Sequence, residues 1–485
     1  MGLKIYNTMS GKKEVFVPIK DNHVRMYVCG VTVYDLCHVG HARSAIVFDT
    51  ISRYLRFSKY GVTFVKNFTD IDDKIITRAA EEGKRWDEVA ETYTKEYYED
   101  MSRLGVASPE VEPKATGHIA EMLKIIATLI DKGYAYEAGG DVFYEVGKFG
   151  DYGTLSKRDL DSMEAGARVE VDPKKRNHFD FALWKKSKEG EPAWDSPWGA
   201  GRPGWHIECS AMSQKHLGDT FDIHGGGADL IFPHHENEIA QSCAATGKPF
   251  ARYWIHNGFI TIDKEKMSKS LGNFFTIRDI LREFDPEVLR VFLLSTHYKS
   301  PIEFSRESLR QTEPSLDRVY STVLRVEEFF KSFKEKTQSS EEDGHFSGIV
   351  NSFKDRFIEA MDDDFNTAAA IAHIFDLIRE LNRYLDKKPA SLQSKQSVAK
   401  AIEQIKECAG VLNIFTKTPH QWYLALLETH GIQISEPEIE ELITKRREAR
   451  QNKDWKLADE IRNTLDKMGI ILEDKVDGTI WKVKV

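Results

Sequence analysis

The sequence predicts an α/β protein with three parts. These are a doubly wound parallel, Rossmann-like domain that carries an insertion, an α-helical bundle, and a small C-terminal α+β unit. Three observations lead to this prediction. Residues 25–68 have the hydrophobic pattern of a strand, a helix and a second strand. The same pattern returns after residue 204, and helical periodicity dominates the chain beyond residue 276.

The first β-α-β unit begins with a strand over 25–33. A polar turn over 35–41, an amphipathic helix over 42–57 and a second strand over 62–68 follow, and Gly61 ends the helix. This length suits a parallel crossover. Such sheets bind ligands beyond the carboxyl ends of their strands, so we expect functional side chains just after Val33 and Phe68.

The middle of the chain interrupts this pattern. Residues 147–204 are rich in Gly, Pro, Trp and charge and have little periodicity. The sheet pattern resumes with a helix over 206–217, a strand over 220–224, a triple glycine, a helix from Pro233 and a strand over 253–262. We therefore expect a first domain made of residues 1–118 and 204–276, with a connective insertion over 119–203.

The remaining residues are predicted to be mostly helical. Junction helices are expected over 277–340, and a bundle domain over 341–430 contains long amphipathic helices within 349–385 and 394–412. A charged helix from Glu436, a stop at Gly469 and a hairpin-like end around Asp477 and Gly478 predict a small domain over 431–485.

The composition excludes several classes of protein. The chain has 485 residues, 41% hydrophobic and 30% charged, which fits about three globular domains. Apolar runs such as 125–130 are far shorter than a membrane span of about 20 residues, and the N-terminus has no signal-like stretch. The five cysteines lack C-x-x-C spacing, which fits a reducing compartment. We expect a cytoplasmic protein with no membrane partner. Its net charge of -9 requires any contact with nucleic acid to be local.

The first motif with chemical potential is His38-Val39-Gly40-His41, where a predicted strand leads into a helix. Helix N-termini attract anions, histidines donate hydrogen bonds to phosphoryl oxygens, and glycine permits close approach of a nucleotide. This pattern favours phosphate binding. The alternative is a pair of solvated histidines near a helix start.

A second motif, Lys266-Met267-Ser268-Lys269-Ser270, places two cations and two hydroxyl groups on a short loop. Cations that meet phosphates most fully in the transition state lower a reaction barrier. The alternative is a solvated basic loop. The first motif lies near the start of the predicted nucleotide-binding domain and the second lies at its end. This order and separation resemble those of the class I aminoacyl-tRNA synthetases. Their usual first motif is H-I-G-H, so valine here replaces isoleucine.

A third group of residues suits a metal ion. His234 and Glu238 lie four positions apart in the helix predicted from Pro233, so they share one face. Cys29 ends the first strand and Cys209 lies on the helix over 206–217, and both lead toward the same end of the sheet. Zinc accepts cysteine, histidine and carboxylate ligands. Buried cysteines and an ordinary His-Glu pair at a helix start are the alternative.

Further stretches of the chain resemble one particular family among these synthetases. Residues 29–35, 204–212, 224–227 and 233–238 resemble the cysteinyl-tRNA synthetase family, as do 69–74, 361–367 and the tail over 453–481. The resemblance implies one zinc ion, held by Cys29, Cys209, His234 and Glu238, that binds the thiolate of the substrate cysteine.

The resemblance also assigns an amino-acid pocket. Cys29, Thr69 and Trp205 are expected to line it, with Gly30, His206 and Asp229 in the same pocket. His224 and His235 lie nearby in the family pattern, and they are either part of the pocket or orient the metal ligands.

The activity implied is ATP-dependent formation of cysteinyl-adenylate from L-cysteine, followed by transfer to the terminal adenosine of tRNA(Cys). His38, His41, Lys266 and Lys269 are the expected catalytic residues. The expected ATP-binding residues add Gly40 and Ser268 to these, with Mg²⁺ accompanying ATP. The chain is expected to act as a monomer.

Transfer RNA recognition is expected to fall to the helical bundle and the tail. A basic helix ahead of Trp455 contains Lys445, Arg446, Arg447, Arg450, Lys453 and Lys456. Its aromatic residue could stack on an unpaired base. Interspersed acidic residues leave a solvated charged helix as the alternative.

Three other functions remain open at this point. The first is a cysteine:amino-sugar ligase of the mycothiol pathway, although that relative lacks the long helical region after Ser300. The second is a metal-dependent hydrolase that uses His224, His234, His235 and Glu238. The third is a non-catalytic RNA-binding protein. The last two leave the motif over 266–270 unexplained.

Overall fold

A computed structural model describes residues 2–158, 173–262, 265–266, 274–336, 338–475 and 478–485. The chain forms two compact units, and each is described by itself. The first contains Met1–Phe274, Thr296–Glu303 and Glu359–Thr367. The second contains Phe275–Ser295, Phe304–Ile358 and Ala368–Val485.

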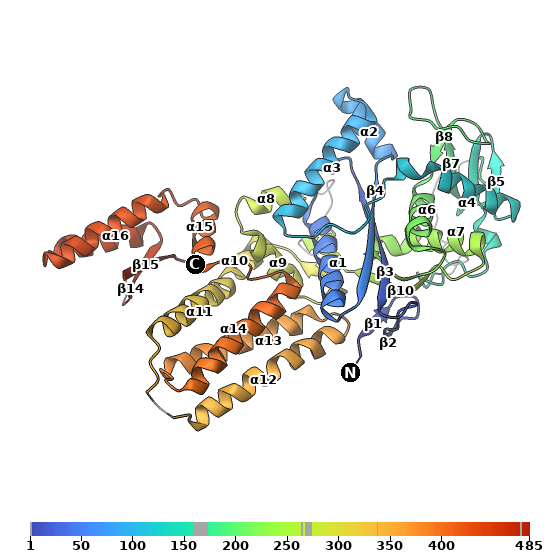
Figure 1. Cartoon of the computed structure of the whole chain (residues 1–485). Helices are drawn as coiled ribbons and strands as arrows, with labels where there is room; N and C mark the ends of the chain where they lie inside the picture. The colour runs from blue at the N-terminus through green and yellow to red at the C-terminus, as the bar shows by residue number, and fades with distance from the viewer. Residues whose placement is uncertain (1, 159–172, 263–264, 267–273, 337, 476–477) are drawn as a thin grey trace. The chain divides into compact units, whose positions relative to one another are not determined.

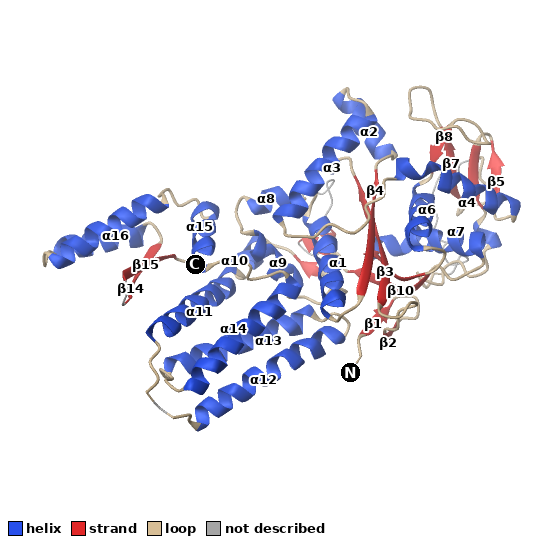
Figure 2. Cartoon of the chain, in the orientation of Figure 1, coloured by secondary structure: helices blue, strands red, loops and turns tan. Residues whose placement is uncertain are grey.

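The first unit is built on a four-stranded parallel sheet in the order β10-β9-β3-β4 (Figures 1 and 2). Its strands are β3 (His23–Thr32), β4 (Gly61–Thr69), β9 (Phe221–Gly227) and β10 (Ala251–Asn257). Helix α1 (Val39–Phe57) connects β3 to the adjacent β4. The predicted β-α-β unit and the doubly wound class are therefore confirmed.

The strand order reverses at β3. The chain passes from β3 to β4 on one side and later adds β9 and then β10 on the other side. Ligands of such sheets bind at the carboxyl ends of strands at this switch point. Here that place lies beyond Thr32 of β3 and Gly227 of β9.

One glycine allows β3 and β4 to approach closely. A Cβ atom at Gly30 would lie 1.5 Å from the carbonyl oxygen of Asn67 on β4. The backbone N–H of Gly30 donates to Oδ1 of Asn67 at 2.8 Å. The register shifts between Val28 and Val31 at this point, so Gly30 fixes the end of β3 against β4.

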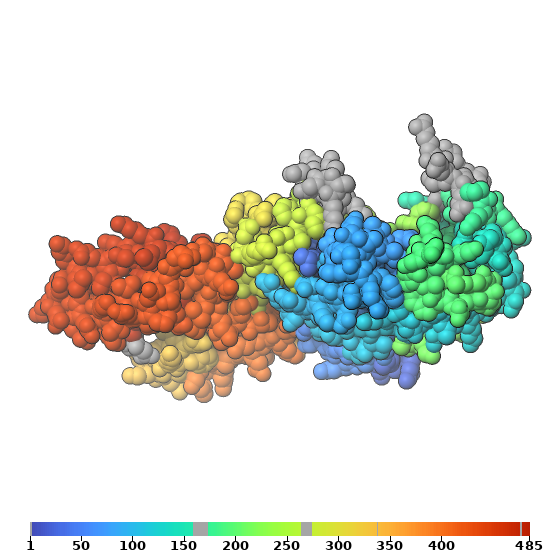
Figure 3. Space-filling view, turned by 90° about the horizontal axis from the view of Figure 1, so that it is seen from above, coloured from blue at the N-terminus to red at the C-terminus, as the bar shows by residue number. Residues whose placement is uncertain are grey.

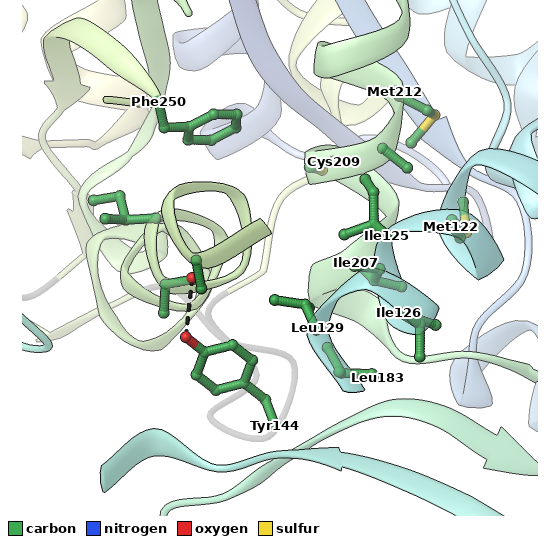
Figure 4. Packing of buried hydrophobic residues seen from close by; sticks show 14 of the residues in the cluster. Met122, Ile125, Ile126, Leu129, Tyr144, Leu183, Ile207, Cys209, Met212 and Phe250 are labelled. Atoms are coloured by element: carbon green, nitrogen blue, oxygen red, sulfur yellow. Dashed lines mark hydrogen bonds between the residues drawn. The ribbon is translucent and has the colours of Figure 1, made fainter. Parts of the chain in front are cut away.

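The helices of the first unit cover the sheet and support the site. They are α2 (Asp73–Glu82), α3 (Trp86–Arg103), α4 (Ile119–Asp131), α6 (Trp205–Leu217) and α7 (Glu236–Thr246). The apolar face of α4 packs on α6 and α7, as Figure 4 shows for Met122, Ile125, Ile126 and Leu129. The hydroxyl of Tyr144 donates to the carbonyl of Ala240 at 3.0 Å and ties α7 to the neighbouring sheet.

The insertion contains more regular structure than the sequence indicated. Strands β5 (Ala135–Ala138), β6 (Asp141–Tyr144), β7 (Phe181–Lys186) and β8 (Gly201–Pro203) form an antiparallel sheet in that order. The last two strands lie within 147–204, where we predicted little periodicity. They escaped prediction because they are short and because Trp184 is buried on a strand that otherwise ends in lysines.

Three further differences concern element boundaries. The triple glycine continues β9 to Gly227, so it is part of the strand. The predicted strand over 253–262 divides at Gly258 into β10 and β11 (Ile260–Ile262). Strand β11 lies between β12 (Glu265–Lys266) and β13 (Ile302–Glu303) in a small separate sheet.

The guanidinium of Arg43 on α1 holds this region together. It is 1% exposed and donates to the carbonyl oxygens of Phe259, Tyr298 and Ser300. Nη1 lies 2.6 Å from the oxygen of Phe259, and Nη2 lies 3.0 Å from that of Tyr298. Because these carbonyls flank β11 and β13, the start of α1 is fixed against the strands that lead to Lys266.

The N-terminal hairpin of β1 (Lys4–Asn7) and β2 (Lys12–Val15) belongs to the first unit, as does the short segment Glu359–Thr367. Asp362 accepts a hydrogen bond from the Tyr54 hydroxyl at 2.7 Å. Asp364 accepts one from the Tyr6 amide at 2.7 Å and one from the Tyr298 hydroxyl at 2.8 Å. This segment is therefore bonded to α1, β1 and the residues just before β13.

The second unit is helical. It comprises α8 (Ile277–Leu281), α9 (Pro286–Leu294), α10 (Arg306–Arg310), α11 (Glu313–Ser332), α12 (Glu341–Asp362), α13 (Thr367–Asp386), α14 (Leu392–Leu412) and α15 (Pro419–Thr429). The predicted helical region over 349–385 is divided between α12 and α13. The division falls where Asp364 and Phe365 have positive φ angles of 65° and 51°, which no helix continues through.

The C-terminal part contains the predicted hairpin, formed by β14 (Ile470–Lys475) and β15 (Gly478–Val483). The single charged helix predicted from Glu436 is instead two helices, α16 (Glu436–Gln451) and α17 (Trp455–Lys467), because Lys453 between them has a positive φ angle of 60°. The basic residues expected on one helix are therefore divided, with Arg446 on α16 and Lys456 on α17. The dark red surface in Figure 3 is formed by this part. Within the described residues, no helix has the length and apolarity needed to span a membrane.

Candidate active site

A cleft of about 310 Å³ lies at the switch point of the parallel sheet. Side chains and backbone from β3, α1, β4, α2, β9 and β10 line it. Cys29, Gly30 and Trp205 lie at one end, and His38, Gly40 and His41 line it from the start of α1. The two predicted groups of residues, the histidine motif and a metal ligand, therefore meet in one cavity.

The histidine motif is shaped by the first turn of α1. His38 is the N-cap residue, and its Nδ1 accepts a hydrogen bond from the N–H of Gly40 at 3.0 Å. Nδ1 of His41 accepts from the N–H of His38 at 3.3 Å, and the two rings stack with centroids 3.7 Å apart. Because Nδ1 is the acceptor in both rings, each neutral imidazole carries its proton on Nε2. Both histidines can thus donate from Nε2 to an anion.

The environment keeps His41 neutral. Burial lowers the pKa of His41 well below its usual value, and electrostatic interactions with His38, Lys66 and Lys74 lower it further. A neutral imidazole beside a helix N-terminus still binds phosphate, because it donates a hydrogen bond without needing its own charge.

Four buried side chains converge at Cys29, which is the one of them that lines the cleft. One ligand atom from each of Cys29, Cys209, His234 and Glu238 lies within 4.8 Å of all the others. Sγ of Cys29 is 3.6 Å from Sγ of Cys209 and 3.3 Å from Oε1 of Glu238. Nε2 of His234 is 3.0 Å from the same oxygen. The predicted juxtaposition of these four residues is thus present in the structure.

Three separate elements bring these ligands together. Cys29 stands near the carboxyl end of β3, and Cys209 lies on the first turns of α6. His234 lies in a turn of π-helix, Ile231–His235, that leads directly into α7, where Glu238 occupies the first turn. The spacing of four positions places His234 and Glu238 on one side, as the sequence predicted.

The distances fit a tetrahedral metal site. Zinc binds cysteine sulfur at about 2.3 Å and nitrogen or oxygen at about 2.0–2.2 Å, which separates adjacent ligand atoms by about 3.3–3.8 Å. The Cys29–Cys209 and Cys29–Glu238 separations agree with these values, and the His234–Glu238 contact is slightly shorter. Both cysteines are free thiols, so the cluster could hold a metal ion.

The protonation of the cluster also suits a cation. Burial opposes ionisation of Glu238, but His224 and His234 lower its pKa to about 2. Burial likewise opposes the Cys209 thiolate, but its hydrogen bonds with Cys29 and His234 lower its pKa to about 6. Burial and the neighbouring Cys209 raise the pKa of Cys29. Burial opposes the charged form of His234, but Glu238 and Cys209 raise its pKa to about 10. The cluster therefore holds two anionic groups, Glu238 and Cys209, and one imidazole whose proton a metal ion would replace.

Surrounding side chains orient the ligands. Nε2 of His224 lies 2.9 Å from Oε2 of Glu238, the oxygen that does not face Cys29. Nδ1 of His206 lies 2.9 Å from Nδ1 of His234, and the Trp205 ring stacks on His234 at 4.2 Å. Contacts of this kind fix the ring orientation of metal-binding histidines. In this structure His206 contacts His234 and His224 contacts Glu238, two of the predicted ligands.

His235 belongs to a separate chain of contacts. Its Nδ1 lies 2.8 Å from Nε2 of His256, whose Nδ1 lies 2.8 Å from the hydroxyl of Thr8. Nε2 of His235 is 4.0 Å from Glu238 and has no hydrogen-bond partner among the described residues. With Cys29, His224 and Glu238 it forms a second group of potential metal ligands that overlaps the first.

The remaining predicted residues divide into three groups. Gly30, Trp205 and Asp229 line the cleft. Thr69 and His206 are not among the lining residues, and the hydroxyl of Thr69 donates to Glu208 at 2.9 Å. The backbone of Lys266 ends β12, whereas Ser268 and Lys269 lie outside the described residues.

Sequence reasoning missed several residues of the site. Lys66 and Lys74 line the cleft beside the histidine motif, and Asn257 lines it from the end of β10. Oδ1 of Asn67 accepts a hydrogen bond from the N–H of Gly30 and lies 3.7 Å from Sγ of Cys209. A signal was available for Lys66 and Asn67, because both polar residues interrupt the apolar run over 62–68.

Family models match most of the chain. Residues 15–314 match the catalytic domain of class I (C) tRNA synthetases. Residues 356–416 match the DALR domain, and residues 435–481 match the cysteinyl-tRNA ligase anticodon binding domain.

Curated relatives are similar over their whole length. The chain is 59% identical to a cysteine–tRNA ligase of Thermodesulfovibrio yellowstonii and 55% identical to one of Geobacter metallireducens, and all of each chain is covered. Among solved structures, methionyl-tRNA synthetase of Mycobacterium tuberculosis in complex with methionyl-adenylate has a TM-score of 0.64 at 15% identity. That match covers 82% of this chain and 93% of the other, and it shows a common fold.

Proposed function

This chain belongs to the cysteine–tRNA ligase family, and from that membership we propose how its cleft joins cysteine to tRNA. The chain is an ATP-dependent ligase of the class I type, and its substrates are ATP, cysteine and tRNA. The observation that carries the proposal is the convergence of Cys209, His234 and Glu238 on Cys29, which lines the same cleft as the histidine motif.

The metal that suits this cluster is zinc. Two cysteines, one histidine and one carboxylate form a donor set that zinc accepts, and the measured separations fit its tetrahedral geometry. When bound, zinc would supply a soft Lewis acid for the thiolate of the substrate cysteine. His206 and His224 hold the ligating groups of His234 and Glu238 in place.

This arrangement explains how cysteine is separated from serine. The two amino acids differ by one atom, and pocket shape discriminates such near-isosteres only weakly. A thiol loses its proton far more readily than a hydroxyl group and is preferred by zinc. Cys29 is both a cluster residue and a lining residue of the cleft, so the substrate side chain reaches the cluster on this side.

The nucleotide is proposed to occupy the α1 end of the cleft. A carboxylate oxygen of cysteine attacks the α-phosphorus of ATP, the bond to pyrophosphate breaks, and cysteinyl-adenylate forms. His38 and His41 donate from Nε2 to phosphoryl oxygens, and the backbone N–H groups of the first turn of α1 face the same charge. Gly40 leaves room for the nucleotide.

The loop after β12 completes the proposed nucleotide site. Lys266 and Lys269 are proposed to balance the charge that develops on pyrophosphate, with Ser268 as a hydrogen-bonding group and Mg²⁺ accompanying ATP. The sequence motif supports this assignment. Arg43 fixes the start of α1 to the carbonyls of Phe259 and Tyr298, beside the strands that lead to Lys266.

Transfer completes the reaction. A hydroxyl group of the terminal ribose of tRNA attacks the carbonyl carbon of the adenylate, and AMP leaves. The match over 435–481 to an anticodon binding domain supports tRNA(Cys) as the partner and disfavours the amino-sugar ligase. We propose that the chain acts as a monomer.

Cysteine-dependent exchange between ATP and labelled pyrophosphate tests this proposal. The zinc-loaded protein should catalyse exchange with cysteine and at least about 100-fold less efficiently with serine, and it should charge tRNA(Cys). A protein that turns over no ATP in the presence of cysteine would refute the proposal. Exchange without tRNA charging would instead support the amino-sugar ligase.

A further inference from the structure

A buried lysine on β4 has no role in the reaction described so far. Lys66 is 8% exposed and lines the cleft. Its Nζ donates to the hydroxyl of Tyr97 on α3 at 3.0 Å and lies 5.4 Å from the centre of that ring. Among the described residues, no carboxylate oxygen comes within the 4.0 Å of an ion pair.

The absence of an ion pair is physically unusual. A buried ammonium group loses its hydration and is normally paired or hydrogen-bonded through all of its protons. Lys66 has three N–H donors, and the Tyr97 hydroxyl accepts one of them. Glu112 is close enough for its pKa to respond to Lys66, but its carboxylate accepts from the hydroxyl of Tyr98 at 3.1 Å.

The position of Lys66 on the strand indicates which part of the cleft it serves. Alternate residues of a strand point to opposite faces. Asn67 and Thr69 contact the metal-cluster side, where their partners are Cys209 and Glu208. Lys66 is an odd number of positions from both residues, so its side chain points to the opposite face of β4, where its partner Tyr97 lies on α3. It therefore faces away from the cluster.

Contacts on that face point to the histidine motif. Lys66 and Lys74 are among the charges that lower the pKa of His41. His38, His41, Lys66 and Lys74 all line the same cavity. One end of the cleft thus presents several hydrogen-bond donors and two ammonium groups, which suits a polyanion and not an amino acid.

We propose that Lys66 is a phosphate-binding residue that contacts the phosphate chain of ATP from the β4 side of the cleft, opposite the histidines of α1. This inference rests on the proposed function, since it concerns the same adenylate-forming step. The leaving pyrophosphate gains negative charge as its bond to the α-phosphorus breaks, so a fixed cation stabilises the transition state more than bound ATP. The Tyr97 hydroxyl holds that cation in position.

The test compares Lys66→Met with Lys66→Arg in pyrophosphate exchange. Methionine keeps much of the side-chain length without charge, and arginine keeps the charge. We expect kcat/KM for ATP to fall 10- to 100-fold in Lys66→Met and at most about fivefold in Lys66→Arg. The KM for cysteine should stay within twofold in both. Lys132→Met is the matched control, because Lys132 donates to the carbonyls of Ala244 and Ala245 and is not a cleft residue.

A binding measurement separates a phosphate contact from a purely structural role. Lys66→Met should weaken binding of ATP at least tenfold and leave binding of adenosine, which has no phosphate, within twofold. Equal losses for ATP and adenosine would overturn the inference, and so would unchanged ATP kinetics in a variant with wild-type melting temperature.

Two further measurements cover the case in which Lys66→Met does not fold and the case in which the proposed function is wrong. If Lys66→Met does not fold, Tyr97→Phe removes the anchoring hydroxyl and should lower kcat/KM for ATP about three- to tenfold; wild-type kinetics there would count against the inference. If the wild-type chain shows no cysteine-dependent exchange, the proposed function fails. The comparison of ATP with adenosine then still decides whether Lys66 binds phosphate.

Discussion

Replacing Cys29 with serine tests the metal cluster most directly. Sγ of Cys29 lies 3.6 Å from Cys209 and 3.3 Å from Glu238, so the substitution removes one of four converging donors. A serine hydroxyl stays protonated at neutral pH and is a poor zinc ligand. Changes to residues that only support metal ligands cost 10- to 100-fold in metal affinity. Loss of a ligand itself should therefore cost at least about 100-fold, which corresponds to about 2.7 kcal/mol.

The assay measures three quantities on Cys29→Ser. Zinc per chain after dialysis against a chelator should fall from one to well below one. The KM for cysteine in pyrophosphate exchange should rise at least tenfold, while the KM for ATP should stay within twofold, because the histidine motif is unchanged. Cys243→Ser is the matched control, since Cys243 is a half-buried free thiol outside the cluster.

Two results would refute the reasoning. One is full zinc retention with an unchanged KM for cysteine, which would exclude Cys29 as a ligand. The other is an equal loss of cysteine and ATP binding at an unchanged melting temperature, which would mean that the two ends of the cleft are not separate.

Three other perturbations address the fold around the site. Gly30→Ala should cost at least about 3 kcal/mol and abolish exchange, because its Cβ would lie 1.5 Å from the Asn67 carbonyl; a wild-type denaturant midpoint would contradict this. Gly410→Ala should stabilise the second unit by about 0.5–1 kcal/mol, because no atom lies within 4 Å of the added Cβ on α14; calorimetry would detect the shift. Burial and His224 lower the pKa of His256 to about 3, so the folded chain keeps this ring neutral while the unfolded chain protonates it near pH 6.5. Stability from this group is present above pH 6.5 and is lost as the pH falls toward 3, by about 2 kcal/mol at pH 5. His256→Gln should reduce the slope of unfolding free energy against pH by about one proton between pH 5 and 6, and an unchanged slope would contradict the assignment.

The sheet could be predicted from the sequence because burial dictates its pattern. β3, α1 and β4 bury most of their side chains, so their hydrophobic periodicity gave their boundaries to within a few residues. β7 and β8 are short strands of the insertion, and pairing with neighbours rather than periodicity defines them. The break between α12 and α13 depends on backbone angles at Asp364 and Phe365, which neither residue type demands.

The site was predictable only in part. His234 and Glu238 follow from helical spacing, but Cys29 and Cys209 are 180 positions apart. The strand and helix pattern placed both cysteines only toward the same end of the sheet, and the family resemblance assigned them to one site. No local rule gives the register that brings β3 beside α6. The contacts of Asn67 also depend on tertiary structure. Its side chain on β4 contacts Gly30 on β3 and Cys209 on α6 only after these three elements have packed together.

The segment Glu359–Thr367 limits how the chain can be divided. It is the only described part of the first unit that follows residue 303, yet Tyr6, Tyr54 and Tyr298 all depend on its carboxylates for a hydrogen bond. A truncated protein that stops after β13 would lose these carboxylate acceptors of the β1 backbone and of two tyrosine hydroxyls. No single cut in the chain therefore separates the two units, because the first unit is assembled from three stretches of sequence and the second from the residues between and after them.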